Sequence, residues 1–209
     1  MNREELQNRL LEEIREAFGD KVQKAALNYG MPEVVIDPSI HVDLARWLKE
    51  HQTWKFVHFT DITAVDHYGD AEHRFEVVVH LHSLEQSLRV RIKVPLEGDE
   101  PELPTLTDVF IGASWPEREV FDLMGITFTG HPRMTRILSP DDFEGHPLRK
   151  DFPVKGTHRG SFPRGTIISN KRREPAVVKR TKPEPADHVL PPTPLEQRRA
   201  PMRGEQRNA

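Results

Sequence analysis

The chain has 209 residues, of which 36% are hydrophobic and 30% are charged, and it contains no cysteine. The missing thiols exclude disulfides, thiolate zinc sites and cysteine-ligated iron–sulfur clusters. No apolar run approaches the roughly 20 residues that cross a bilayer, and the charged N-terminus lacks a signal-peptide core. We therefore expect a folded, non-secreted protein that reaches a membrane only through partners.

Charge divides the chain into two unlike parts. Residues 155–209 contain 13 Lys and Arg against 5 Asp and Glu, whereas residues 1–154 contain 17 basic and 28 acidic residues. The basic part is rich in proline and poor in apolar residues, so it cannot bury enough surface to offset the entropy of ordering. We predict a folded domain over 1–154. Residues 155–209 should be an extended irregular arm that is disordered or ordered by a partner.

The first half of the domain shows two helical patterns and several strand patterns. Residues 4–18 repeat apolar side chains at helical spacing, and a helix-start signal at 37–39 precedes a second such pattern. Alternation of apolar and polar side chains is clearest in the later strands. The predicted strands are 22–27, 33–36, 55–65, 73–81 and 88–94, the last two joined as an antiparallel hairpin. The fold class is therefore α+β, a mostly antiparallel sheet with helices packed on one side.

A third helix is predicted from Ser114 to Met124, with Gly125 as its left-handed terminator. Ser114 and Glu117 have the spacing of a capping box, in which each side chain bonds the other residue's backbone N–H. Three carboxylates and Arg118 crowd this helix. An acid–base enzyme would use such a pair, but charges that pair within the helix and with a neighbour fit better, because no nucleophile accompanies them.

Beyond this helix the sequence contains two matching corners, Gly130-His131-Pro132 and Gly145-His146-Pro147. Glycine permits a positive φ, and proline pushes the preceding histidine into an extended conformation. Acidic residues around Asp141 lie close in sequence to basic residues around Arg149. So polar a segment, with its path set by prolines, suits docking on another protein. A two-histidine metal site lacks a third ligand.

At these residues the chain resembles the 30-kDa subunit family of proton-translocating NADH–quinone oxidoreductase (bacterial complex I), whose bacterial members carry the letter C. The resemblance is near-continuous over 117–153 and looser back to about residue 56. Its motifs read Glu117-Arg118-Glu119-Val120-Phe121-Asp122-Leu123-Met124-Gly125-Ile126, then Gly130-His131-Pro132, Arg136-Ile137-Leu138 and Asp141-Asp142-Phe143-Glu144-Gly145-His146-Pro147-Leu148-Arg149-Lys150-Asp151-Phe152-Pro153.

The resemblance implies a non-catalytic subunit of the hydrophilic arm, peripheral on the cytoplasmic side of the inner (plasma) membrane. It implies contact with the quinone-site subunit, which bacterial naming letters D, and with cluster-bearing subunits. FMN and iron–sulfur clusters would belong to partner subunits, and NADH and quinone would be substrates of the whole complex. No catalytic, cofactor or metal residue is expected in this chain. The predicted interface residues are Glu117, Arg118, Glu119, Asp122, Gly125, His131, Arg136, Asp141, Asp142, His146, Arg149, Lys150 and Asp151.

Three other functions remain open from the sequence. The equivalent subunit of a related membrane-bound complex, such as an energy-converting hydrogenase or a dehydrogenase with another donor, would have a similar sequence. A free-standing metal-dependent hydrolase would use the histidine corners with Asp141 and Asp142, and would bind metal when isolated. A nucleic-acid-binding protein would act through the basic arm, although no aromatic residue follows Phe162 to stack on bases.

Overall fold

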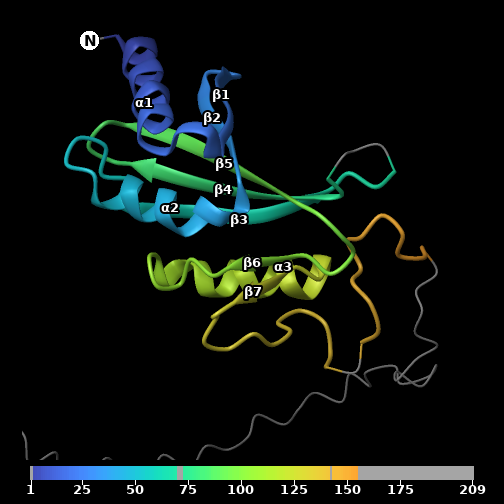
Figure 1. Ribbon diagram of the computed structural model, residues 1–209. Coiled ribbons are helices and arrows are strands. Elements are labelled where there is room, and N and C mark those ends of the chain that lie inside the picture. Colours follow the sequence, from blue (N-terminus) through green and yellow to red (C-terminus); the bar gives the residue numbers. More distant parts are fainter. Residues whose placement is uncertain (1, 70–72, 142, 155–209) are drawn as a thin grey trace, which may run out of the picture. The chain divides into compact units, whose positions relative to one another are not determined.

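The computed structural model describes residues 2–69, 73–141 and 143–154 (Figure 1). The predicted arm at 155–209, and with it the predicted boundary at 154, lies outside the described residues. The elements are α1 Arg3–Phe18, β1 Val22–Asn28, β2 Met31–Ile36, α2 His41–Glu50, β3 His58–Asp66, β4 Phe75–Ser83, β5 Leu88–Leu96, β6 Glu102–Pro104, α3 Ser114–Met124 and β7 Thr127–Thr129, with 3-10 turns at Gly19–Lys21, Pro38–Ile40 and Ile111–Ala113.

Five strands form the main sheet in the order β1-β2-β5-β4-β3, and every neighbouring pair is antiparallel except β2 with β5. One register row crosses all five strands through Ala25, Val34, Ile92, Val79 and Ile62, and each of these side chains is buried. Because side chains alternate along a strand, this row marks one continuous apolar face. The short strands β6 and β7 pair in parallel as a second sheet.

Helices α1 and α2 pack on the apolar face, and this arrangement confirms the predicted α+β class. Leu10 and Ile14 of α1 and Leu44 and Leu48 of α2 are fully buried in the same core as the sheet residues. Phe18 at the end of α1 contacts the ring of Trp47 in α2 edge to face. The opposite face carries a polar register row, Glu33, Arg91, His80 and Asp61, although Val78 on the same face is buried. Helix α3 runs beside the edge strand β3 (Figure 1).

Local chemistry moves two predicted boundaries. The strand predicted from residue 55 begins at His58, because Lys55 has a positive φ of 41° and Val57 N–H closes a tight turn onto the Lys55 carbonyl. The helix start predicted at 37–39 is a 3-10 turn capped by the Asp37 side chain, which accepts from Ser39 N–H at 2.9 Å. Helix α2 follows that turn directly.

The pH dependence of stability should report on His41, the first residue of α2. Its side chain is 1% exposed, and neither ring nitrogen has a hydrogen-bond partner among the described residues. Burial lowers the pKa of His41 to about 3. The unfolded chain takes up a proton near pH 6.5 that the folded chain refuses, so stability falls as pH decreases below 6.5.

We expect the free energy of unfolding to drop by roughly 1–2 kcal/mol between pH 6.5 and 5. Urea unfolding of the full chain at several pH values measures this slope. The substitution His41→Leu should reduce this slope, whereas His58→Gln at an exposed histidine should not. The slope that remains belongs to His80 and His146, whose pKa burial also lowers. An unchanged slope in the His41 variant would contradict the assignment. Carboxylates with lowered pKa lose their contribution mainly below about pH 5, outside this window.

Candidate interface segment

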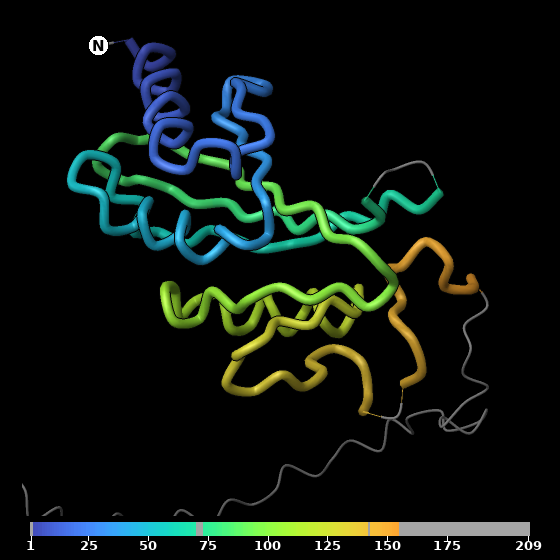
Figure 2. Tube along the Cα trace, in the orientation of Figure 1, coloured from blue at the N-terminus to red at the C-terminus, as the bar shows by residue number. Residues whose placement is uncertain are grey.

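Three buried carboxylates connect α3 and β3 to distant parts of the chain. Glu117 and Asp122 of α3 are fully buried, and Asp66 at the end of β3 is 4% exposed. A buried charge is costly unless hydrogen bonds and ion pairs satisfy it. Each of these side chains is satisfied by backbone groups or by side chains from another element. Asp122 and Asp66 hold the segment that follows α3, which is yellow to orange in Figure 2, whereas Glu117 holds residues that precede the helix.

Asp122 has the densest set of partners. Its Oδ2 accepts from three consecutive backbone N–H groups, those of Ile137 (3.1 Å), Leu138 (2.7 Å) and Ser139 (2.7 Å). Its Oδ1 accepts from Arg136 Nη1 at 2.7 Å. Burial alone would raise the pKa of Asp122, but these donors outweigh it and hold the pKa well below its usual value. The carboxylate therefore stays ionised and holds residues 136–139 against the helix.

The C-terminal carbonyls of α3 are covered by the second histidine–proline corner. His146 Nδ1 donates to the Asp122 carbonyl at 2.9 Å, and Leu148 N–H donates to the Leu123 carbonyl at 3.0 Å. Arg149 donates from Nε to the Met124 carbonyl at 2.6 Å and from Nη2 to the Gly125 carbonyl at 3.2 Å. Helix ends leave such carbonyls unpaired and carry partial negative charge, so a guanidinium is well placed here.

Gly125 allows this close approach. Its φ of 72° ends α3 in the left-handed conformation, as predicted. A Cβ at this position would lie 2.5 Å from His146 Cδ2 and would also collide with Arg149. Glycine is therefore needed for backbone conformation and for space alike.

The capping box predicted at the start of α3 is wrong. Glu117 turns away from the helix end: its carboxylate accepts from Leu106 N–H at 2.7 Å and from Thr105 Oγ1 at 2.5 Å. Burial raises the pKa of Glu117 despite these two donors. Ser114 Oγ instead lies 3.1 Å from His131 Nε2. Tertiary partners on the segment after β6 thus outcompete the local cap.

The charges of α3 bond neighbouring segments, as predicted, but the predicted pairing within the helix is wrong. Arg118 donates to the Thr135 carbonyl at 3.0 Å and to the Arg136 carbonyl at 3.1 Å, and its guanidinium lies 5.0 Å from the ring centre of Trp115. Asp122 bonds Arg136 instead of Arg118. The helix charges therefore hold the chain segment that passes beside them.

Asp66 and Arg74 also hold the segment after α3, and the sequence had not indicated a role for them. With Asp122, Arg136, His146 and Arg149 they form a set of side chains that we call the clamp. Asp66 accepts from Lys150 N–H at 2.8 Å, and Arg74 pairs with Asp151 at 2.8 Å. Burial would raise the pKa of Asp66, but bonds from Lys150, Arg74 and Tyr68 hold it below its usual value. Asp66 and Lys150 are 84 residues apart, so no local spacing could have connected them.

The histidine corners hold the backbone and do not form one catalytic group. His131 Nδ1 accepts from Arg133 N–H at 3.0 Å, so Nε2 carries the proton and cannot act as a base toward Ser114. His131 lies at the start of α3 and His146 at the Asp122 carbonyl, a separation of about 12 Å along the helix. The two rings are too far apart to share a metal. Within the described residues no cluster of three ligand side chains is arranged for one.

The structure brings together five of the predicted interface residues at the C-terminal end of α3: Asp122, Gly125, Arg136, His146 and Arg149. Lys150 joins them through Asp66 of β3. Asp151 joins them through Arg74, while Glu117 and His131 anchor other parts of α3. Arg118 lies along the outer side, and Glu119 and Asp141 are exposed. Asp142 lies outside the described residues.

These contacts define an α+β domain whose buried charged side chains bond its own backbone. Its described helices include none that is both long and apolar enough to span a bilayer. The chain matches the family described as "Respiratory-chain NADH dehydrogenase, 30 Kd subunit" over residues 34–158. The protein therefore belongs to this family of NADH–quinone oxidoreductase subunits.

Individual relatives carry names of the same family. The chain is 46% identical over 143 residues to the NADH-quinone oxidoreductase subunit named C 2 of Rhizobium etli (strain CIAT 652), covering 68% of this chain and 75% of the relative. It is 44% identical over 144 residues to the subunit named C of Brucella ovis (strain ATCC 25840 / 63/290 / NCTC 10512), covering 68% and 70%.

Two solved structures share the fold. One is a trypsin-resistant fragment of Nqo5 (TM-score 0.51, 30% identity), and the match covers 60% of this chain and 97% of that one. The other is a chain of the membrane-bound sulfane sulfur reductase (MBS), an archaeal respiratory membrane complex (TM-score 0.60, 25% identity), with 75% and 96% covered.

Replacing the buried carboxylate should have a large effect on stability. We expect Asp122→Asn to lower the free energy of unfolding by about 3 kcal/mol, because it removes a buried charge and leaves Arg136 without its partner. The exposed Asp141→Asn makes the same chemical change and should cost little. Urea unfolding of the two full-length variants compares their stabilities. Equal urea midpoints for the two variants would contradict the role given to Asp122.

A pair of glycine substitutions separates backbone strain from steric conflict. Gly98→Ala should lower the free energy of unfolding by about 1 kcal/mol, because Gly98 has a φ of 80°. A Cβ added there would meet no described heavy atom within 4 Å. Gly125→Ala should cost at least about 1 kcal/mol more, because its Cβ displaces His146 and Arg149 as well. Thermal unfolding measures both costs, and limited proteolysis should cleave residues 143–154 faster in the Gly125 variant alone.

Proposed function

We propose that this chain is a non-catalytic subunit of the hydrophilic arm that supports assembly of the quinone-reducing module. One observation carries the proposal: the segment 117–153, which bears the family resemblance, is held to the domain by its buried charged side chains. Glu117 of this segment bonds Thr105 and Leu106, which precede α3. Asp66 accepts from Lys150 N–H, and Arg74 pairs with Asp151. Asp122 and Arg149 bond backbone groups within the segment. A polar segment held so rigidly suits a docking surface, because little of its freedom is left to lose on binding.

In this proposal the chemistry belongs to the whole complex. Electrons pass from NADH through FMN and iron–sulfur clusters of partner subunits to a quinone, coupled to proton translocation. This chain has no cysteine, so it cannot supply thiolate ligands to a cluster. Its neighbours would be the quinone-site subunit and cluster-bearing subunits, at the cytoplasmic face of the inner (plasma) membrane. Its own contact with the membrane would run only through those subunits.

Purification from the native cell tests the proposal. The chain is tagged, the membranes are solubilised gently, and the copurifying subunits are identified while NADH-dependent quinone reduction is assayed. Copurification of flavin, iron–sulfur and membrane subunits with this activity is the expected result. Recovery of the chain alone from the soluble fraction would overturn the proposal.

A second candidate is the equivalent subunit of a related membrane-bound complex with another electron donor. The likeness to a chain of an archaeal sulfane sulfur reductase favours it, because the same fold serves a respiratory complex that is not named for NADH. The electron donor would be set by other subunits. In the purification above, a hydrogenase or other input module without NADH-dependent activity would select this candidate.

Assembly should depend on Arg149, which covers the C-terminal carbonyls of α3. We expect Arg149→Ala to lower the yield of assembled complex several-fold, since losing hydrogen bonds from a charged donor costs about 1.5–3 kcal/mol. Arg133→Ala, an exposed arginine on the other corner, is the matched control and should assemble normally. Blue native electrophoresis of solubilised membranes gives the yields. Equal yields in both variants would show that assembly does not depend on Arg149.

A further inference from the structure

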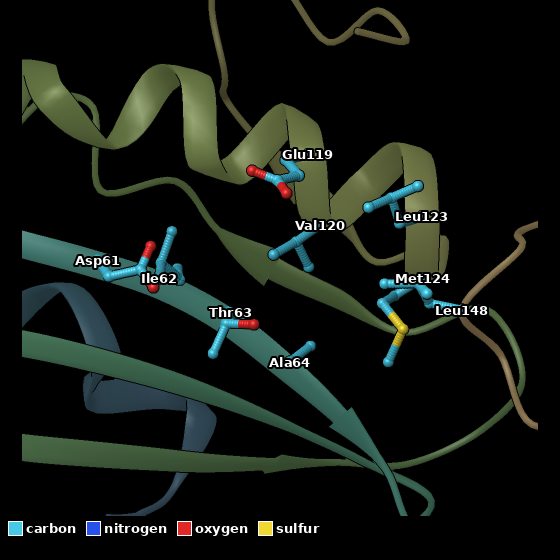
Figure 3. Close-up of a pocket in the computed structure, with 9 residues that line it drawn as sticks. All are labelled: Asp61, Ile62, Thr63, Ala64, Glu119, Val120, Leu123, Met124 and Leu148. Carbon is cyan, nitrogen blue, oxygen red and sulfur yellow. The ribbon is translucent and has the colours of Figure 1, made fainter. Parts of the chain in front are cut away.

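A groove of about 100 Å³ lies between strand β3 and helix α3 (Figure 3). Val120 and Met124 of α3 line it with apolar surface, and Leu148 borders it from the segment after the second histidine corner. Asp61 borders it from the strand and Glu119 from the helix, so carboxylates stand on both sides of the gap. The clamp thus builds one wall of this groove, because it positions Leu148.

The size of the groove limits what can occupy it. Pockets for cofactors and drug-sized ligands measure roughly 300–1,000 Å³, and a cavity of about 150 Å³ holds one benzene. A volume of about 100 Å³ is too small for a quinone ring with its tail or for a nucleotide. It leaves room only for the tip of one side chain entering from the open side, which favours a protein partner over a small ligand.

The chemistry of the groove selects the kind of side chain. Asp61 and Glu119 are exposed, and within the described chain neither carboxylate accepts a hydrogen bond or forms an ion pair. Among the same described residues, no lysine or arginine lines the groove. His80 lies opposite Asp61 in the sheet; burial and the nearby charge of Arg91 lower its pKa although Asp61 acts to raise it, so it adds no positive charge at neutral pH. Among the described residues, the groove thus presents two carboxylates beside apolar side chains and no basic side chain.

Leu148 adds an apolar surface that is already held in place. Its side chain is 58% exposed, yet its backbone N–H is bound to the Leu123 carbonyl at 3.0 Å. Lysine and arginine combine an aliphatic stem with a charged head, so one such side chain can pack on a leucine and bond carboxylates at the same time. Arginine fits best, because its planar fork can reach two acids at once.

We propose that this groove docks a basic segment of a neighbouring subunit, which inserts an arginine or lysine over Leu148 and between Asp61 and Glu119. The proposal rests on the proposed function, since it needs a complex around the chain. It goes further by naming the surface, the chemistry of the partner and the two acids that select it.

Photo-crosslinking in the assembled complex tests the contact. Benzoylphenylalanine replaces Leu148, and in a control it replaces Leu84, which is 61% exposed in the β4–β5 turn. The expected result is a crosslink from position 148 to a peptide of another subunit with a lysine or arginine within two residues of the attachment point. A crosslink to a neutral or acidic peptide, to this chain itself or to lipid would overturn the proposal, as would no crosslink within an intact complex.

Reversing the charges on the two sides of the contact then tests whether Glu119 attracts a basic partner. Glu119→Lys turns attraction into repulsion and should speed loss of the chain from the complex roughly tenfold in salt washes. Glu12→Lys makes the same change on an exposed part of α1 and should leave retention unchanged. Changing the crosslinked basic residue to Glu should restore retention of the Glu119 variant. Normal retention of that variant, or no rescue, counts against the proposal.

The two proposals fail in distinguishable ways. If the tagged chain copurifies with no other subunit, the proposed function fails and this docking site with it. If the chain is present in an active complex but position 148 crosslinks elsewhere, only the docking site fails.

Discussion

The structure after α3 depends on one buried ion, the carboxylate of Asp122. It is fully buried, and it collects three consecutive backbone N–H groups and a guanidinium. A buried charge would be costly by itself, but here its removal would also leave several donors unsatisfied. The chain must therefore fold back along α3 at residues 136–139. That return then brings the second histidine corner to the carbonyls at the end of the helix.

Bonds of the same kind explain why the buried acids of α3 and β3 have a structural role. A catalytic carboxylate needs an accessible oxygen and a pKa near the working pH. Asp122 and Asp66 have pKa values held below their usual range by donors that occupy their oxygens. Glu117 has a raised pKa, but its oxygens are bound to Thr105 and Leu106. These three carboxylates hold backbone segments together, and the proposed docking therefore uses acids that are exposed, Asp61 and Glu119.

The segment 117–153 thus has two sides with different chemistry. Its inward side is filled by Asp122 and Arg136, which bond each other, and by Arg149, which bonds backbone carbonyls. Its outward side presents Glu119 and Leu148 at the groove beside β3. This division would let one fold serve respiratory complexes with different donors. The inner bonds would keep the domain the same, while the choice of partner would rest on a few exposed side chains.

Much of this domain could be predicted from the sequence, because strands and helices bury side chains with fixed periods. Alternation over 88–94 and helical spacing over 4–18 placed their elements, and Gly125 marked a helix end. The capping box at Ser114 could not be excluded from the sequence, since only the folded chain brings Thr105 and Leu106 to Glu117. Likewise, Asp66 meets Lys150 across 84 residues. Spacing encodes bonds within a helix turn or strand, and tertiary structure decides which distant donor satisfies a buried acid.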